Sequence, residues 1–318
     1  MARPLDRTTY RGLWAAVPTP WTDAGRLDEP VLRRNCEKLA AAGADGIYTT
    51  DSDGEFYAIE LDAFRALARV FGDTVAAAGV DAAMGVTWSH TRGTINRIKA
   101  ACDAGVPNVH VALPFFMPLA PSDVDPFFED LASAVPEARW IHYAHPRTAP
   151  PLRGADYARL AARHEQLIGT KLGTSDLTEL ADILLGSPDL AHSVVDPTMA
   201  PAMMLGAVGC CSYWFNTLPR WHRAYMDHCL AHRWDEAMAC HRRLMGWELN
   251  HIRPLREKGY RHGILGKARG ALSGFLEDSG RTQPPYRPVP ASLQRSLREA
   301  FAAYWAGELE QERAPAST

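Results

Sequence analysis

The alternation of short apolar segments with helical patterns is the feature that most constrains how this chain folds. Eight apolar segments of strand length follow one another, and segments with the spacing of an amphipathic helix separate them. The expected strands are residues 13–17, 46–51, 82–88, 109–113, 140–144, 167–174, 191–196 and 209–214. This order predicts a parallel sheet with helices packed outside it. Eight is the number of strands that closes a TIM (β/α)8 barrel.

A doubly wound open sheet is the alternative arrangement of the same elements. It is disfavoured because no expected strand is followed by a G-x-G-x-x-G turn or a Walker sequence. After Trp214 the pattern changes to helices only. We therefore expect an α/β TIM barrel over residues 10–218, a C-terminal helical extension over residues 219–306 and a disordered tail over residues 307–318.

Composition and charge exclude several classes of function. The chain has 318 residues, 47% of them hydrophobic and 22% charged, which is typical of a globular protein with a large core. The net charge is -3 and no Lys/Arg-rich run is present, so we expect no nucleic-acid partner. No apolar run is long enough to span a bilayer and the N-terminus has no signal-peptide pattern, so we expect no membrane partner. The six cysteines form no C-x-x-C pair, and a reduced, cytoplasmic protein is the simplest interpretation.

One lysine stands within the sixth expected strand. Lys171 lies in the run Leu-Ile-Gly-Thr-Lys-Leu-Gly-Thr, and it is the only one of five lysines that falls on an expected strand. Burying an ammonium group is unfavourable unless the group is paired or loses its proton. A lysine that loses its proton near neutral pH is a nucleophile for carbonyl groups. The alternative is a buried ion pair, although no acid stands beside Lys171 in the sequence.

Polar side chains also end the second and fifth expected strands, where TIM barrels carry their catalytic groups. Alternation places Tyr143 and His145 on one face of the fifth strand. Tyr143 is either a phenol that relays protons or a core tyrosine, and His145 is either an acid–base or substrate-binding group or a structural one. The second strand ends Asp-Ser-Asp-Gly-Glu over residues 51–55. The backbone N–H groups of such a loop can bind an anion, although an ordinary turn has the same composition.

Three histidines fall on one expected helix after the barrel. His228 and His232 have the i,i+4 spacing that can bind zinc, and His222 precedes them. The glutamate of an H-E-x-x-H motif is missing, because Cys229 holds its position. We expect no metal site and no cofactor.

Six short motifs follow one another in a fixed order. They are P-T-P-W at 18–21, D-S-D-G-E at 51–55, Y-A-H-P at 143–146, G-T-K-L at 169–172, a longer motif from Leu205 to Pro219, and P-P-Y-R-P at 284–288. Their order and spacing resemble T-P-F, G-T-T-G-E, Y-N-x-P, G-x-K-D, L-G-A-x-G-x-x-S-x-x-x-N-x-x-P and P-P-L-x-P of the dihydrodipicolinate synthase / N-acetylneuraminate lyase family. This family contains class I aldolases. The resemblance runs from about residue 12 to residue 290, most of the chain.

Within this family the chain is most similar to the hydratase-aldolases that act on aromatic adducts of pyruvate. Those enzymes carry Y-A-N-P on the fifth strand after an A-V-P-E turn, and P-P-Y near the C-terminus. Here A-V-P-E stands at residues 134–137, Y-A-H-P at 143–146 and P-P-Y at 284–286.

The resemblance implies a role for each matched residue. Lys171 is the Schiff-base lysine, and Tyr143 passes protons while the iminium forms and breaks. The loop with Ser52, Asp53 and Gly54 holds the acid end of the substrate. Further candidates for substrate contact are Phe116, His145, Trp214 and Asn216. Family members are usually homotetramers, so a homo-oligomer, tetramer or dimer, is implied.

Three positions depart from the family pattern and bear on the substrate. Pro-Phe-Phe at residues 114–116 replaces a tyrosine pair, so that part of the proton relay is not carried over, and Phe116 suits an aromatic substrate or core packing. Asp53 stands where a threonine or an apolar residue is usual. Its carboxylate repels that of an oxo acid unless it is protonated or points away, or unless the substrate differs from a 2-oxo acid. His145 replaces an asparagine of the hydratase-aldolases, so the resemblance does not determine the identity of the leaving group.

The resemblance and the residues together predict a class I (Schiff-base) lyase. It cleaves or forms a carbon–carbon bond next to a 2-oxo acid such as pyruvate, with an aldehyde as the second small-molecule partner. The amine of Lys171 attacks the ketone, and exclusion of water from the barrel mouth is expected to lower the pKa of this amine. A hydratase-aldolase acting on an aromatic or apolar aldehyde adduct is the finer expectation. The alternatives are a dehydratase or condensing synthase on a different oxo acid, and a catalytically lapsed barrel that acts as a ligand sensor.

Overall fold

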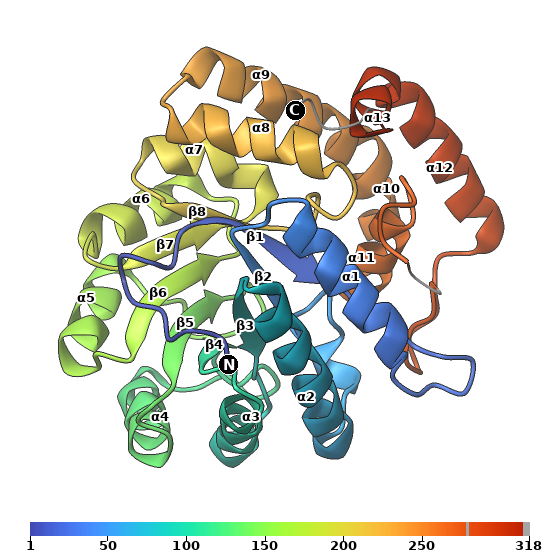
Figure 1. The fold of residues 1–318 in the computed structure, drawn as a ribbon. Coiled ribbons are helices and arrows are strands. Elements are labelled where there is room, and N and C mark those ends of the chain that lie inside the picture. Colours follow the sequence, from blue (N-terminus) through green and yellow to red (C-terminus); the bar gives the residue numbers. More distant parts are fainter. Residues whose placement is uncertain (278–279, 314–318) are drawn as a thin grey trace.

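Eight parallel strands close into a barrel in sequence order, which confirms the predicted TIM fold (Figure 1). The computed structural model describes residues 1–277 and 280–313. The strands are β1 (Gly12–Val17), β2 (Gly46–Thr49), β3 (Asp81–Gly85), β4 (Asn108–Val111), β5 (Arg139–Ala144), β6 (Leu167–Leu172), β7 (Ala191–Val194) and β8 (Gly209–Ser212). The pairing of β8 with β1 completes the ring.

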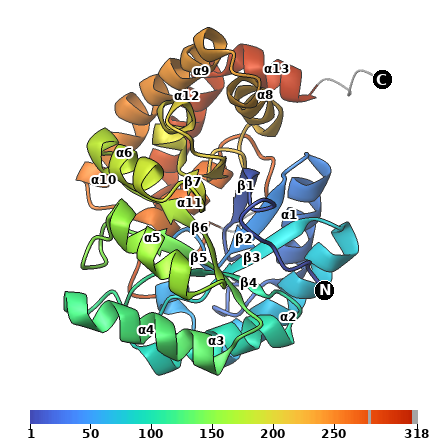
Figure 2. The same ribbon diagram turned by 90° about the vertical axis from the view of Figure 1, so that its left-hand side faces the viewer.

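Helices cover the outside of the barrel, as Figures 1 and 2 show from two directions. They are α1 (Glu29–Ala41), α2 (Leu61–Ala78), α3 (Thr91–Asp103), α4 (Pro121–Ala134), α5 (Gly154–Arg163), α6 (Leu177–Gly186), α7 (Met199–Met204) and α8 (Pro219–Leu230). Local sequence sets their ends. The carboxylate of Asp28 accepts a hydrogen bond from the N–H of Val31 at the start of α1, and α2 ends at Gly79, which adopts the left-handed conformation.

Large side chains fill the part of the barrel near the N-terminal ends of the strands. The ring of Trp14 on β1 is fully buried and lies against Gly46 on β2, where a Cβ atom would overlap the indole. Tyr10 packs on Trp14, with 5.0 Å between the ring centroids. The interior is therefore a packed core at this level, and the open space lies toward the C-terminal ends of the strands.

The helical extension follows α8 and returns to the barrel. It consists of α9 (Trp234–Trp247), a π-helical turn (Glu248–Ile252), α10 (Arg253–Glu257), α11 (His262–Gly270), α12 (Ala291–Tyr304) and α13 (Ala306–Arg313). Helix α11 contacts the loop after β2 through two buried ion pairs, Lys267 with Glu55 and Arg269 with Asp53. The extension thus helps to shape the C-terminal end of the barrel. None of the helices in the described ranges is long and apolar enough to cross a membrane.

The chain end differs from the disordered tail that the sequence pattern predicts. Residues 306–313 form α13, while residues 314–318 lie outside the described residues. Glu308 is paired with Arg243 of α9 at 2.7 Å, and the carboxylate of Glu312 accepts a hydrogen bond from the N–H of Trp221 at 3.0 Å. These contacts to α8 and α9 give the polar segment partners that its own sequence does not reveal.

Candidate active site

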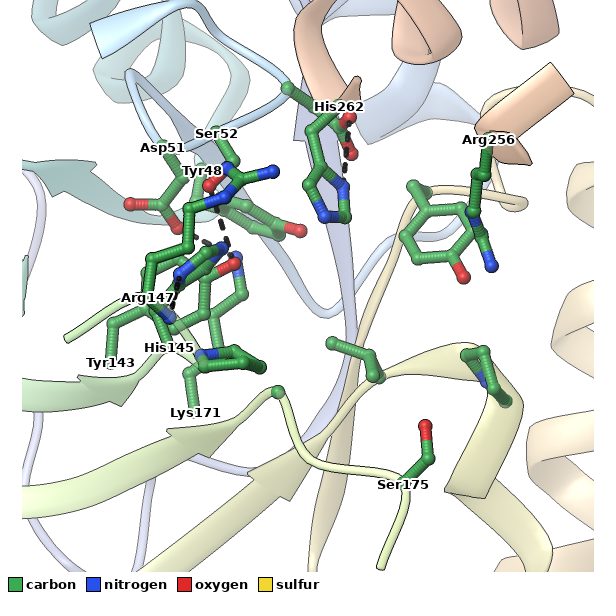
Figure 3. Close-up of a pocket in the computed structure, with 16 residues that line it drawn as sticks. Tyr48, Asp51, Ser52, Tyr143, His145, Arg147, Lys171, Ser175, Arg256 and His262 are labelled. Atoms are coloured by element: carbon green, nitrogen blue, oxygen red, sulfur yellow. Dashed lines mark hydrogen bonds and ion pairs between the residues drawn. The ribbon is translucent and has the colours of Figure 1, made fainter. Parts of the chain in front are cut away.

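Lys171 lies near the C-terminal end of β6, and its side chain reaches the floor of a cavity at the barrel mouth (Figure 3). The residue is 3% exposed. Its Nζ atom is 4.1 Å from the ring centroid of Tyr48 and 4.2 Å from that of Tyr143. Tyr143 lies on the neighbouring strand β5 and is the register partner of Lys171.

A buried carboxylate holds the lysine. The Nζ atom of Lys171 donates a hydrogen bond to Oδ2 of Asp51 at 2.7 Å. The ring of His110, on β4, lies with Nδ1 2.6 Å from the same oxygen. The ion pair that was the alternative interpretation of Lys171 is therefore present. Asp51 follows β2 and stands 120 residues from Lys171 in the sequence, so no local pattern reveals this contact.

A missing side chain on β3 makes room for this carboxylate. Gly85 lies beside Asp51, and a Cβ atom at Gly85 would overlap Oδ1 of the carboxylate. The same atom would also overlap the carbonyl oxygen of Thr50. Glycine at this position therefore lets the loop that carries Asp51 pass close to β3.

The pair is an ammonium and a carboxylate in the resting protein. Burial by itself lowers the pKa of Lys171, but the negative charge of Asp51 outweighs burial and raises it. For Asp51, burial acts to raise the pKa, and the charges of Lys171 and His110 bring it down to about 2. The expectation that exclusion of water lowers the pKa of Lys171 is therefore wrong for the resting site, because it left out the acid.

The hydroxyl groups of Tyr143 and Ser52 lie close to each other in the cavity that contains Lys171. The hydroxyl oxygens of the two residues are 3.5 Å apart. Burial raises the pKa of Tyr143, opposed by the charge of Lys171, so the phenol keeps its proton and can donate it. Among the described residues, no acceptor is found for the backbone N–H groups of Ser52 and Asp53. These N–H groups and the two hydroxyls are suited to an anionic group beside Lys171.

Asp53 lines the cavity, but its charge has a partner. Its carboxylate lies 3.3 Å from Nη2 of Arg269 on α11, which is buried. Burial raises the pKa of Asp53, and Arg269 acts against this shift. The cation compensates the carboxylate that the sequence pattern left without explanation, and Asp53 does not point away from the site.

His145 presents a hydrogen-bond donor to the cavity. Burial, with the nearby charges of His262 and Arg147, lowers the pKa of His145 to about 3, so the ring is neutral near pH 7. Its Nδ1 atom accepts a hydrogen bond from the backbone N–H of Arg147 at 3.1 Å. The proton of the neutral ring is therefore on Nε2.

Two cavities meet at this site. The first, of about 260 Å³, contains Lys171 and also includes Tyr213, Arg256 and His262. The second, of about 310 Å³, combines aromatic side chains with polar ones such as Thr148 and Arg261. Its aromatic lining residues are Phe56, Tyr57, Phe115, Tyr143 and Tyr286. Ser52, Tyr143, His145 and Arg147 line both spaces, so they stand between the lysine and the aromatic cavity.

Four predicted contact residues lie away from the cavity surface. Phe116 is 78% exposed, and its neighbour Phe115 lines the aromatic cavity instead. Trp214 is buried and donates through Nε1 to Glu248 at 2.7 Å. Asn216 donates to the carbonyl of Ala16, and the N–H of Gly54 donates to the carbonyl of Asp51. These polar groups support the loops of the site.

The sequence analysis did not single out several residues of the site. Strand alternation carries a signal for two of them, because Tyr48 and His110 occupy inward positions of β2 and β4. The π-helical turn and α11 supply the others, and no sequence pattern connects these segments with the barrel. Arg256, for example, reaches the cavity while it is paired with Glu248 at 3.0 Å.

Comparisons with known proteins point to one family. The model of the dihydrodipicolinate synthetase family matches residues 9–298. A 4-hydroxy-tetrahydrodipicolinate synthase of Thermus thermophilus is 26% identical over 96% of this chain and 100% of its own length. One from Acidiphilium cryptum is 27% identical over 92% and 97%, respectively.

Two solved structures share the fold. YagE from E. coli K12, a prophage protein in complex with pyruvate, superposes with a TM-score of 0.84 at 22% identity, covering 93% of this chain and 98% of its own. PhdJ bound to a substrate intermediate superposes with a TM-score of 0.82 at 22% identity, covering 97% and 99%.

Proposed function

Since this chain belongs to the dihydrodipicolinate synthetase family of Schiff-base lyases, we propose that Lys171 forms an iminium with a 2-oxo acid. The enzyme then makes or breaks the carbon–carbon bond next to the iminium carbon. One observation carries this proposal: the Nζ atom of Lys171 lies on the floor of the cavity at the C-terminal end of the barrel, between the rings of Tyr48 and Tyr143.

The surroundings of the lysine fit a small oxo acid. The hydroxyls of Ser52 and Tyr143 and the N–H groups of the loop after β2 are suited to its carboxylate. Pyruvate is the first compound to test, because the related YagE structure contains it.

The iminium is the centre of the proposed mechanism. Its positive nitrogen accepts the electron pair released when the bond between the carbons α and β to it breaks, and it returns the pair when that bond forms. Tyr143, whose phenol is protonated, exchanges protons with the substrate oxygen as the iminium forms and is hydrolysed.

The second cavity supports an aromatic or apolar aldehyde as the other partner. Phe56, Phe115 and Tyr57 offer ring surfaces there, and the space adjoins the lysine cavity. The Nε2–H group of His145 lies at the junction and is suited to the oxygen of the aldehyde. This arrangement favours a hydratase-aldolase that acts on an aromatic adduct of pyruvate.

A condensing synthase is the second candidate. The curated relatives are named as 4-hydroxy-tetrahydrodipicolinate synthases, and the exposed Arg147 lines both cavities, where its guanidinium suits an acidic aldehyde. Benzaldehyde and succinic semialdehyde, each offered with pyruvate, separate the two. We expect pyruvate consumption to be faster with benzaldehyde; faster consumption with the acidic aldehyde favours the synthase.

Covalent trapping tests the proposal. Borohydride added with pyruvate is expected to leave a pyruvate-sized adduct on Lys171, detected by mass spectrometry of the peptide, and Lys171→Ala is expected to abolish it. Lys99→Ala, on the outer helix α3, is the control and retains the adduct. An adduct that survives in Lys171→Ala contradicts the assignment of the lysine. Absence of an adduct with every 2-oxo acid favours the lapsed barrel.

A further inference from the structure

We propose that Asp51 is a further catalytic residue, which takes the proton from the ammonium group of Lys171 and delivers it to the oxygen that leaves the substrate ketone. His110 is the positioning residue that aims the carboxylate. This inference rests on the proposed function, because it concerns the formation of the same iminium.

The carboxylate is placed for direct proton transfer. Oδ2 of Asp51 is 2.7 Å from Nζ of Lys171, so no water is needed between donor and acceptor. Asp51 also lines the cavity in which the ketone must lie. Its Oδ1 atom is buried and has no hydrogen-bond partner among the described residues, which leaves the carboxylate capacity to carry a proton.

The chemistry requires such an acceptor. An ammonium group has no lone pair, so Nζ must lose one proton before it can attack the carbonyl carbon. The new carbon–nitrogen bond forms as the carbonyl π bond breaks, and the oxygen receives that proton. A second proton then passes from nitrogen to oxygen, and the carbon–oxygen bond breaks to release water. The third proton stays on the iminium nitrogen, so atoms and charge balance without another reactant.

The carboxylate of Asp51 stabilises both the starting state and the final state of these steps. The ammonium and the iminium each carry one positive charge next to Asp51, whereas the neutral amine and the carbinolamine do not. Asp51 therefore stabilises the reactant and the covalent product alike, and a carboxylate that accepts the proton lowers the barrier between them.

His110 holds the acceptor in place. Its Nδ1 atom lies 2.6 Å from the same Oδ2 atom that contacts the lysine. Burial lowers the pKa of His110, against the effect of Asp51, so the ring is neutral and its Nδ1–H donates to the carboxylate. The Nε2 atom has no partner among the described residues, so the ring is anchored through this one hydrogen bond.

Other titratable groups surround the pair and contribute to any pH profile. Tyr48 and Asp53 face it from β2 and the following loop, and Tyr143 and His145 from β5 and the loop after it. Tyr10 lies near Asp51, Cys211 of β8 near Lys171, and His262 of α11 at the mouth. The test therefore compares variants at equal pH rather than assigning a single midpoint.

Asp51→Asn separates proton transfer from charge pairing by the sign of the effect. Removing the negative charge favours the neutral amine, so a carboxylate that only holds the ammonium would make the variant faster. Loss of a proton acceptor makes it slower. We expect the rate of pyruvate trapping at pH 7, with cyanoborohydride and the full chain, to fall about 100-fold. A rate equal to or above that of the wild type overturns the proposal.

Chemical rescue and a matched control complete the test. Asp51→Ala leaves space for a small acid, and added formate is expected to raise the trapping rate of this variant at least tenfold. If formate does not raise the rate of the folded variant, the result counts against a proton-transfer role. Asp196→Asn removes a carboxylate that is equally buried and paired with His222 at 2.7 Å, but bonded to Ser212 rather than to the lysine. Thermal melting of Asp51→Asn and Asp196→Asn measures how much stability each loses with its buried charge. The trapping rate is expected to fall in Asp51→Asn and not in Asp196→Asn.

The role of His110 is tested separately from folding. His110→Asn keeps an N–H donor near the position of Nδ1 and is expected to retain most of the trapping rate, whereas His110→Leu is expected to lose about tenfold. Equal rates in the two variants contradict the positioning role. If the wild type forms no adduct with any 2-oxo acid, the proposed function fails and this inference falls with it. If the wild type forms the adduct and Asp51→Asn forms it at least as fast, the proposed function stands and the inference about Asp51 fails.

Discussion

A buried histidine on a barrel strand makes the stability of the fold depend on pH. His142 on β5 is buried, and its Nδ1 atom lies 2.8 Å from the hydroxyl of Tyr157. Burial lowers its pKa to about 3, whereas an exposed histidine titrates near 6.5. Between these values the unfolded chain binds a proton that the folded chain does not. The contribution of His142 to stability is therefore complete above about pH 6.5 and is lost as the pH falls.

This residue predicts a pH dependence of unfolding. The free energy of unfolding of the wild type is expected to fall between pH 6.5 and pH 4, and His142 supplies up to about 1.4 kcal/mol per pH unit of that slope. Urea denaturation at a series of pH values measures it. His142→Asn, which keeps a polar partner for Tyr157, is expected to be less stable at pH 7 and to show a shallower slope. Parallel curves for the two proteins would contradict the assignment.

The lysine shows how far residue-level reasoning reaches. Its place on a strand, next to Tyr143, follows from periodicity within single segments. Its charge state does not, because the decisive partner, Asp51, comes from the loop after another strand, and this loop needs a glycine on a third. Burial and pairing act in opposite directions on the pKa of a lysine, so a pattern that shows only burial gives the wrong sign.

In the segment after β2, every second residue from 51 to 55 is an acid that forms an ion pair. Asp51, Asp53 and Glu55 contact Lys171, Arg269 and Lys267, respectively. Glu55 has a left-handed backbone with a φ of 59°, which a residue other than glycine adopts at a cost. Its carboxylate accepts hydrogen bonds from Trp21 at 3.2 Å and from the N–H of Gln283 at 2.9 Å. Two of the three cations come from α11, so this helix and the substrate loop form one unit.

Removing the cation opposite Glu55 tests this coupling. Lys267→Met leaves the carboxylate buried and without its charged partner, and the free energy of unfolding is expected to fall by about 3–5 kcal/mol. The loop is expected to loosen as well, seen as faster amide hydrogen exchange over residues 51–56.

A double variant supplies the control for the pair. Lys267→Met with Glu55→Gln removes both charges and keeps a hydrogen-bonding side chain at position 55. We expect it to regain most of the lost stability, because no charge is left buried alone. A double variant as unstable as Lys267→Met would show that the ion pair is not the cause.

At the scale of the molecule, the barrel is predictable and the shape of its mouth is not. The strands of the barrel and the helices between them follow from periodicity over about ten residues, and eight repeats leave few topologies. The loops have no period, which is why the pattern points to Phe116 while Phe115 lines the cavity. The polar groups of Trp214 and Asn216 bond to the π-helical turn and to β1, contacts that connect distant parts of the sequence.

The space beside Gly85 belongs to the backbone of the neighbouring loop as much as to the carboxylate. A Cβ atom at position 85 would overlap the carbonyl oxygen of Thr50 as well as Oδ1 of Asp51. A side-chain oxygen can turn away, whereas a backbone carbonyl moves only with its loop. A designer who wishes to place a carboxylate beside the Schiff-base lysine of another barrel therefore has to copy the course of this loop, and the loop in turn needs a glycine on the neighbouring strand.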